Sequence, residues 1–138
     1  MDCIQGRCLC GVVVFEVADD FKYAGYCHCS QCRRLSGSAF SSFGGIVDSN
    51  LKVVSGSDFI TFYQKSESSN IAFCKQCGSP LFSQKAVLGL YHVRLGVLDR
   101  PPTLQPQAHI FVGSKAAWFN FCDDLPKFSS LPPNQKTT

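Results

Sequence analysis

Seven of the nine cysteines in this 138-residue chain fall into three tight clusters. The clusters are Cys8-x-Cys10, Cys27-x-Cys29-x2-Cys32 and Cys74-x2-Cys77. Cysteines at such spacings are typical zinc ligands. Structural zinc takes four protein ligands, whereas catalytic zinc takes three and leaves a position for water or substrate. Seven thiolates divide into one closed site of four and one open site of three, so we expect two Zn²⁺ ions, one structural and one catalytic.

The first and third clusters are predicted to form the structural site. Side chains two apart in a strand lie on one face, so Cys8 and Cys10 can bind one ion from a single edge. Cys74-x2-Cys77 followed by Gly78 is typical of a zinc-knuckle turn, because glycine readily takes positive φ. Structural zinc contributes about 10–16 kcal/mol in zinc-finger peptides, comparable with the about 5–15 kcal/mol stability of a whole domain. Loss of any of these four ligands is expected to prevent folding.

The middle cluster is predicted to form the catalytic site. Cys27, Cys29 and Cys32 lie within six residues and can occupy three corners of one tetrahedron. Such a compact group cannot easily supply the fourth corner, which stays open unless a distant side chain closes it. An open zinc position binds a thiol as its thiolate and lowers the pKa of that thiol. The predicted chemistry is therefore the activation of a thiol substrate.

Several cationic and histidine side chains have both a functional and a structural interpretation. Arg33 and Arg34 can bind the carboxylates of an anionic substrate such as glutathione, neutralise the thiolates, or lie on a solvated helix face. His28 is a fourth ligand, a proton carrier, or a ring that points away from the metal, which its position between two ligands favours. His92 and His109 lie in β-like runs and are expected to be structural.

Composition limits the partners of the chain. The formal charge is +3, and seven thiolates with two divalent ions together contribute −3, which cancels it. Without a basic excess, nucleic acid is an improbable partner. Residues 1–7 lack the apolar run of a secretory leader, and no stretch approaches the ~20 apolar residues of a membrane helix. We expect a cytoplasmic protein, where cysteines stay reduced, with no membrane partner and an oligomeric state that the sequence leaves open.

Short β-branched and aromatic runs separated by Gly, Ser, Pro and Asp predict a mainly β fold in a single domain over residues 1–131, with a frayed tail at 132–138. One short helical turn is expected near residues 30–36, with Ser30 as its N-cap and Gly37 after its end. Cys3 and Cys122 lie outside the clusters and are expected to be buried. The strands are predicted at Val12–Val17, Ala39–Val47, Leu51–Val54, Phe59–Gln64, Ile71–Phe73, Leu81–Gln84 and Tyr91–Leu95.

Four motifs resemble the glutathione-dependent formaldehyde-activating enzyme family, which includes the centromere protein V group. The resemblance spans about Gly6 to Phe128. Its motifs are Gly6-x-Cys8-x-Cys10-Gly11-x-Val13, Cys27-His28-Cys29-Ser30-x-Cys32-Arg33-Arg34-x-Ser36-Gly37, Phe73-Cys74-x2-Cys77-Gly78-Ser79-Pro80-Leu81, and His109-Ile110-Phe111-x2-Ser114-Lys115-Ala116-x-Trp118 with Asp123-Asp124-Leu125-Pro126-x-Phe128.

The resemblance implies a zinc-stapled β-tent of small antiparallel sheets and a carbon-sulfur lyase that joins glutathione and formaldehyde into S-hydroxymethylglutathione. By resemblance, the partners are a small thiol and a small aldehyde, with glutathione as co-substrate. The structural ligands are Cys8, Cys10, Cys74 and Cys77, and the catalytic ligands are Cys27, Cys29 and Cys32. One departure concerns residues 69–72: relatives often carry arginines there, and this chain has Ser69-Asn70-Ile71-Ala72.

Two other functions fit parts of the sequence. A non-catalytic, zinc-stabilised binding module is favoured if a fourth side chain closes the middle site. A dithiol redox protein is suggested by the CxxC spacings at Cys29-x2-Cys32 and Cys74-x2-Cys77. Redox motifs of this kind usually begin a helix in a thioredoxin-like pattern, which this sequence lacks.

Overall fold

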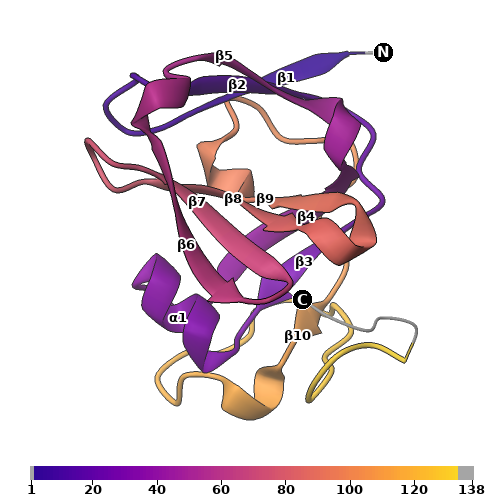
Figure 1. The fold of residues 1–138 in the computed structure, drawn as a ribbon. Coiled ribbons are helices and arrows are strands. Elements are labelled where there is room, and N and C mark those ends of the chain that lie inside the picture. The colour runs from indigo at the N-terminus through magenta and orange to yellow at the C-terminus, as the bar shows by residue number, and fades with distance from the viewer. Residues whose placement is uncertain (1, 134–138) are drawn as a thin grey trace.

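The computed structural model describes residues 2–133, and within them the chain is mainly β, as predicted, with two sheets and one α-helix (Figure 1). The small sheet is antiparallel and has the order β1-β2-β5. Its strands are β1 (Cys3–Arg7), β2 (Val14–Ala18) and β5 (Leu51–Ser55).

The large sheet has the order β10-β3-β4-β9-β8-β7-β6 and is antiparallel except for the β10–β3 pair. Its strands are β3 (Tyr23–Cys27), β4 (Ser41–Val47), β6 (Ile60–Ser66), β7 (Ser69–Cys74), β8 (Pro80–Lys85), β9 (Leu90–Val93) and β10 (His109–Ile110). Single 3-10 turns cover Asp48–Asn50, Ser57–Phe59, Ala86–Leu88, Leu95–Val97 and Val112–Ser114.

All seven predicted strands are found, with shifted ends, whereas β1, β3 and β10 were not predicted. The β3 sequence Tyr-Ala-Gly-Tyr-Cys contains no β-branched residue, and β10 has only two residues. These strands exist because tertiary pairing overrides weak local propensity.

The one α-helix, α1 (Ser30–Ser36), lies where it was predicted, but its N-cap is Cys29 and not Ser30. The Cys29 sulfur accepts a hydrogen bond from the backbone N–H of Cys32 at 3.3 Å. The helix ends at Gly37, whose φ of 61° is the left-handed conformation that glycine adopts without strain. A cysteine therefore caps the helix on which the next cysteine of the cluster lies.

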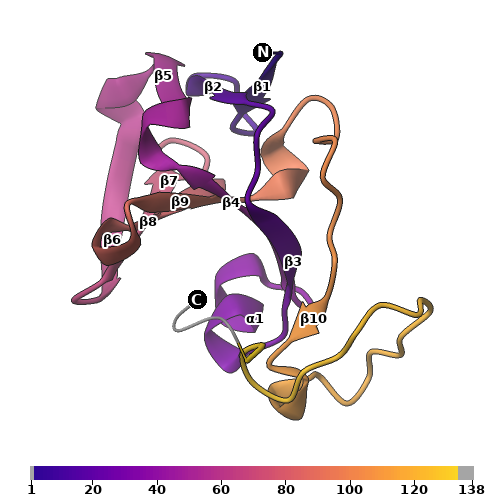
Figure 2. The same ribbon diagram turned by 90° about the vertical axis from the view of Figure 1, so that its right-hand side faces the viewer.

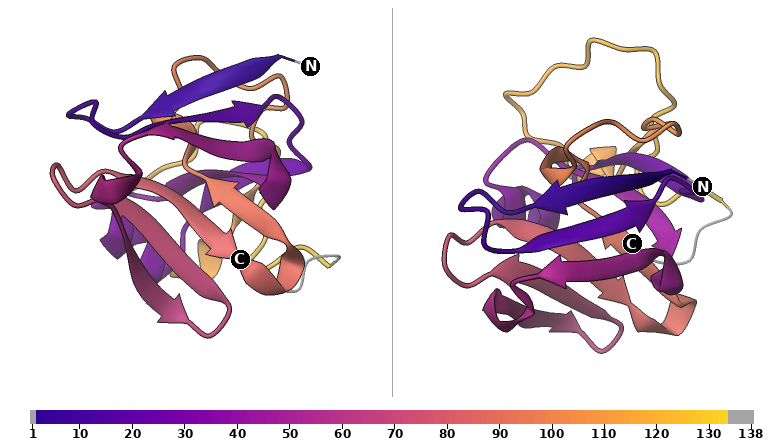
Figure 3. Two further views of the ribbon diagram at one scale, coloured as in Figure 1. Left: turned by 45° about the horizontal axis from the view of Figure 1, so that its top comes forward. Right: turned by 90° about the horizontal axis from the view of Figure 1, so that it is seen from above.

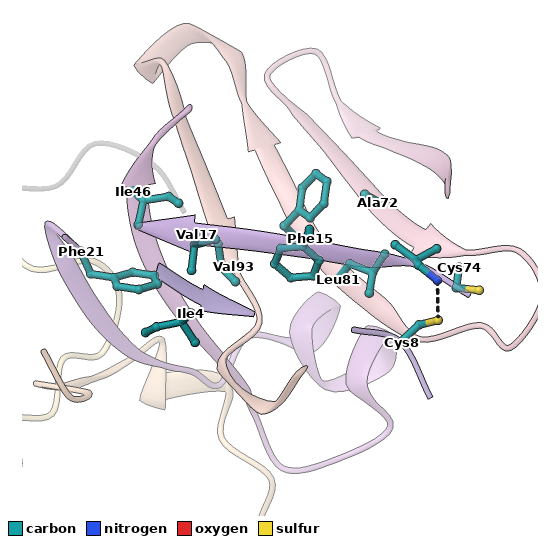
Figure 4. Close-up of a cluster of buried hydrophobic side chains, with 12 residues drawn as sticks. Ile4, Cys8, Phe15, Val17, Phe21, Ile46, Ala72, Cys74, Leu81 and Val93 are labelled. Carbon is teal, nitrogen blue, oxygen red and sulfur yellow. Dashed lines mark hydrogen bonds between the residues drawn. The ribbon is translucent and has the colours of Figure 1, made fainter. Parts of the chain in front are cut away.

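The main core lies between the two sheets, with the small sheet across one end of the large one (Figure 3). Strand β2 alternates buried and half-buried residues, and its Phe15 lies in the core cluster (Figure 4). The Phe15 ring meets the Phe82 ring of β8 edge-on, with the ring centroids 5.7 Å apart. Gly6 makes room for this ring, because a Cβ at position 6 would lie 2.4 Å from Phe15. The aromatic contact sets how closely the sheets approach.

Three expectations about cysteines are corrected by the structure. Cys8 and Cys10 lie in the turn that follows β1, not in a strand, so the turn and not the pleat brings their sulfurs together. Cys3 and Cys122 are exposed, not buried. Cys3 begins the edge strand β1, and Cys122 lies in an irregular segment.

The segment after β9 returns along the molecule, adds β10 to the edge of β3 and continues around the end of the large sheet (Figure 2). Backbone hydrogen bonds between residues 109–113 and 126–130 close this segment on itself. We call residues 109–131 the C-terminal arm. Of the predicted frayed tail, residues 134–138 lie outside the described residues. No helix among residues 2–133 is long and apolar enough to cross a membrane.

Phe15→Ala is expected to lower the free energy of unfolding by about 3–5 kcal/mol, because it removes a fully buried ring from the contact between the sheets. Urea denaturation at saturating zinc measures the change. Phe62→Ala is the matched control, because Phe62 is 48% exposed. Equal losses in the two variants would contradict this account of the core.

Candidate metal centres and the adjoining cavity

Four sulfur atoms, from Cys8, Cys10, Cys74 and Cys77, all lie within 4.8 Å of one another. The Cys8 and Cys10 sulfurs are 3.6 Å apart, and the Cys10 and Cys74 sulfurs are 3.9 Å apart. Ligands of a tetrahedral zinc ion with Zn–S bonds of about 2.3 Å are about 3.8 Å apart. The arrangement thus fits a zinc ion and is too wide for disulfides, which need about 2.05 Å.

Polar groups around these sulfurs favour the thiolate form, whereas burial acts in the opposite direction and raises the pKa of Cys74 to about 11. Backbone N–H groups of Val13 and Cys77 donate to the sulfurs of Cys8 and Cys74 at 3.3 and 3.4 Å. The Gln76 side-chain amide donates to Cys10 at 3.3 Å. A hydrogen bond with the Ser79 hydroxyl lowers the pKa of Cys77 to about 5. Donors of this kind stabilise metal-bound thiolates.

The sulfurs of Cys27, Cys29 and Cys32 form a second group within 4.8 Å, at the end of β3 and the start of α1. Among residues 2–133, no fourth histidine, cysteine or carboxylate belongs to this group. Hydrogen bonds from the thiols of Cys27 and Cys32 hold the pKa of Cys29 low, at about 2, and the bond to Cys29 raises the pKa of Cys27. Without a cation, these three cysteines hold a single negative charge. All three can be thiolates together only when a cation binds between them.

A cavity of about 350 Å³ lies between α1 and the large sheet, and Cys27 and Cys32 line it. Phe43, Tyr63 and Ile71 contribute apolar and aromatic wall. Its volume is at the lower end of the range of small-molecule sites, about 300–1,000 Å³. A small ligand in this cavity would contact the three-cysteine group.

The cavity is lined by four cations, Arg34, Lys65, Lys85 and Arg94, and by no acidic side chain of the described residues. Lys85 is buried and donates to the Ser69 hydroxyl at 2.9 Å. Burial, with Lys65 and Arg94 nearby, lowers its pKa to about 8.

Arg94 donates to the Ser83 hydroxyl at 2.8 Å, and its buried Nε has no hydrogen-bond partner among the described residues. Burial lowers the pKa of Arg94, and the thiols of Cys32 and Cys27 act in the opposite direction. An Arg with an unused buried donor and no acidic neighbour in the cavity can bind an anionic ligand.

The predicted site residues separate in the structure. Arg34 lines the cavity, whereas Arg33 does not. The Nε of Arg33 is buried and has no hydrogen-bond partner in the described part of the chain. His92 lies in the cavity wall, where its ring stacks on Phe43 and its Nε2 lies 2.7 Å from the Tyr23 hydroxyl. Burial lowers the pKa of His92 to about 3, so the ring is neutral.

His28 is not part of the metal group, and its ring packs instead against Phe119 and Phe121, in agreement with the orientation that the sequence favoured. It is fully buried, and its Nε2 lies 2.8 Å from Nδ1 of His109. The opposite nitrogen of His109, Nε2, lies 2.9 Å from a carboxylate oxygen of Asp123. Sequence analysis missed these hydrogen bonds between Asp123, His109 and His28. The two histidines are 81 residues apart, and so large a spacing gives no local pattern in the sequence.

Comparisons with known proteins agree with the geometry. The sequence model of a family described as glutathione-dependent formaldehyde-activating enzyme matches residues 3–114. Two proteins provisionally named glutathione-dependent formaldehyde-activating enzymes, from Aspergillus flavus and Aspergillus oryzae, are each 28% identical over 113 residues. The matches cover 78% of this chain and 59% of those proteins, so the chain spans little more than half of their length.

A solved structure also resembles this chain. The crystal structure of a Rhodobacter sphaeroides protein superimposes with a TM-score of 0.59 at 29% identity. The match covers 74% of this chain and 91% of that protein. The arrangement of strands is therefore shared with a protein known from experiment.

Cys77→Ser and Cys29→Ser are expected to differ sharply. Cys77→Ser removes a ligand of the group that joins the sheets and should abolish soluble, folded protein. Cys29→Ser should leave a folded protein with one zinc ion fewer, because serine retains a helix-capping oxygen. Circular dichroism and metal analysis of the purified variants measure this, and equal unfolding in both would contradict the division of roles.

Proposed function

Because the chain belongs to the glutathione-dependent formaldehyde-activating enzyme family, we propose that it is a zinc-dependent carbon-sulfur lyase that adds a glutathione-like thiol to formaldehyde. The sulfur forms a bond to the carbonyl carbon while the C=O π bond opens. The thiol proton is released, and a proton is delivered to the carbonyl oxygen. The product is an S-hydroxymethyl thioether, and no electrons leave or enter.

The observation that supports this proposal best is the position of the three-cysteine group on the cavity. Cys27, Cys29 and Cys32 would hold a zinc ion with one position free, and Cys8, Cys10, Cys74 and Cys77 would hold the structural ion. A zinc ion with a free position supplies a binding point for the substrate thiol and lowers its pKa. The cavity would then hold the thiol and the aldehyde next to each other, so that the addition becomes an effectively unimolecular step.

Arg94 and Lys85 would bind the anionic part of the thiol substrate. Three thiolates and Zn²⁺ carry a net charge of −1, and a fourth thiolate makes it −2, so nearby cations stabilise the occupied site. Arg94 lines the same cavity, and its Nε donor has no hydrogen-bond partner among residues 2–133. Arg94 and Lys85 would take over the anion binding of the arginines that this chain lacks at residues 69–72. Arg34 would bind the same anionic group from the cavity mouth.

Lys85 is also the proposed proton donor for the product oxygen. Its ammonium group lies in the cavity wall, and its pKa of about 8 is close to neutral pH. A group with such a pKa can give up and recover a proton in each turnover. Phe43 and Ile71 would reduce the access of water to the reacting carbon.

Titration of the cobalt-substituted protein with glutathione tests the thiol site. Glutathione is expected to change the thiolate-to-cobalt charge-transfer bands, because a new sulfur ligand enters at the open position. The Cys29→Ser protein, which retains the four-cysteine group, is the control and should show no change. Unchanged bands in the unmodified protein would refute the lyase proposal and favour a non-catalytic binding module.

Arg94→Gln is expected to reduce the affinity of the cobalt protein for 3-mercaptopropionate by about tenfold or more, since a charge-assisted hydrogen bond contributes about 1.5–3 kcal/mol. The affinity for uncharged 2-mercaptoethanol should stay unchanged. The same spectroscopic titration measures both constants. Arg33→Gln is the matched control, because Arg33 is a nearby cation outside the cavity wall. Equal losses for both thiols would show that Arg94 has only a structural role.

A further inference from the structure

A chain of hydrogen bonds links the surface of the C-terminal arm to the three-cysteine loop. Asp123, whose side chain is 40% exposed, contacts His109, which is buried, and His109 contacts His28. His28 is the residue between the ligands Cys27 and Cys29. The arm therefore contacts the loop through His28, which is not part of the sulfur group.

The contacts fix the protons of both rings. A carboxylate can only accept, so His109 Nε2 carries a proton and donates to Asp123. If His28 Nε2 donates to His109 Nδ1, the buried Nδ1 of His28 is an acceptor without a partner in the described part of the chain. The reverse direction would bury an N–H donor without a partner, which is rarer in proteins. Both rings are therefore Nε2–H tautomers.

Packing and backbone contacts hold the His28 ring in a single position. The rings of Phe40, Phe119 and Phe121 surround it, with centroids 5.1, 5.6 and 5.5 Å away. Its backbone N–H donates to Ile110 of β10 at 2.9 Å. A residue fixed at both its ring and its backbone cannot rotate without moving the ligands on either side.

We propose that Asp123 and His109 are positioning residues that act through His28 to hold Cys27 and Cys29 at metal-binding spacing. This inference rests on the proposed function in one respect, that the three-cysteine group holds a metal ion. With only three ligands, the loop lacks the closure that the four-cysteine group has. The contact of the C-terminal arm with His28 restricts the loop instead. It keeps the three sulfurs together while the fourth position stays free for substrate.

The test is the rate of zinc release from the Asp123→Ala protein to a chromogenic chelator. Release from the three-cysteine group should become about tenfold faster or more, the usual effect of removing a group that orients metal ligands. Release from the four-cysteine group should stay unchanged. Asp123→Asn should behave nearly as the unmodified protein, because the amide oxygen still accepts from His109. Nitrogen NMR should show both Nε2–H tautomers in the unmodified protein and exchange of the His109 proton in Asp123→Ala.

Asp19→Ala is the matched control, because Asp19 also anchors a loop, by accepting from the N–H and hydroxyl of Thr103 at 3.0 and 2.8 Å. Unchanged release in Asp123→Ala, or equal acceleration at both sites in Asp123→Ala and Asp19→Ala, would overturn the inference. A purified protein that contains one zinc ion would refute the proposed function and this inference together. Two zinc ions without selective release would refute the inference alone.

Discussion

Repulsion between thiolates placed close together is the constraint on which this structure depends. Four sulfurs within 4.8 Å of one another can be ionised together only around a cation. Cys8 and Cys10 follow β1 of the small sheet, and Cys74 ends β7 of the large sheet. The same cation would thus join the sheets that the Phe15–Phe82 contact also holds together. Metal binding and core formation stabilise one interface, so each favours the other.

The same constraint explains why cations are buried beside the three-cysteine loop. Burial disfavours the charged forms of Lys85 and Arg94, and in both the neighbouring thiols act in the opposite direction. A buried cation and a half-buried cation close together are unfavourable by themselves and become favourable beside a negative cluster. The thiols of Cys27 and Cys32 therefore offset part of this cost, and an additional anionic ligand there would be compensated by the same charges.

The parts that the sequence predicted are those with a local signal. Cysteine spacing predicted the membership of both sulfur groups, and β-branched alternation predicted seven strands. The Cys29 cap was missed because serine, and not cysteine, is a usual N-cap residue, although the Cys29 sulfur accepts a hydrogen bond as a serine oxygen does. Lys85 and Arg94 were missed because they come from the ends of β8 and β9, far along the chain from the loop. Their convergence depends on strand order, which local patterns do not determine.

The loop from Cys27 to Cys32 has two sides with different tasks. Its sulfur side faces the cavity, and the ring of His28 faces the C-terminal arm. A three-ligand metal site must be rigid to keep its spacing and open to admit a substrate, and one surface cannot meet both demands. The fold separates them by bracing the loop from behind. Asp123 lies beyond residues 3–114, which the family model matches. It belongs to the motif from Asp123 to Phe128 that resembles the family, so the residue that braces the loop lies far along the chain from the cysteines that it positions.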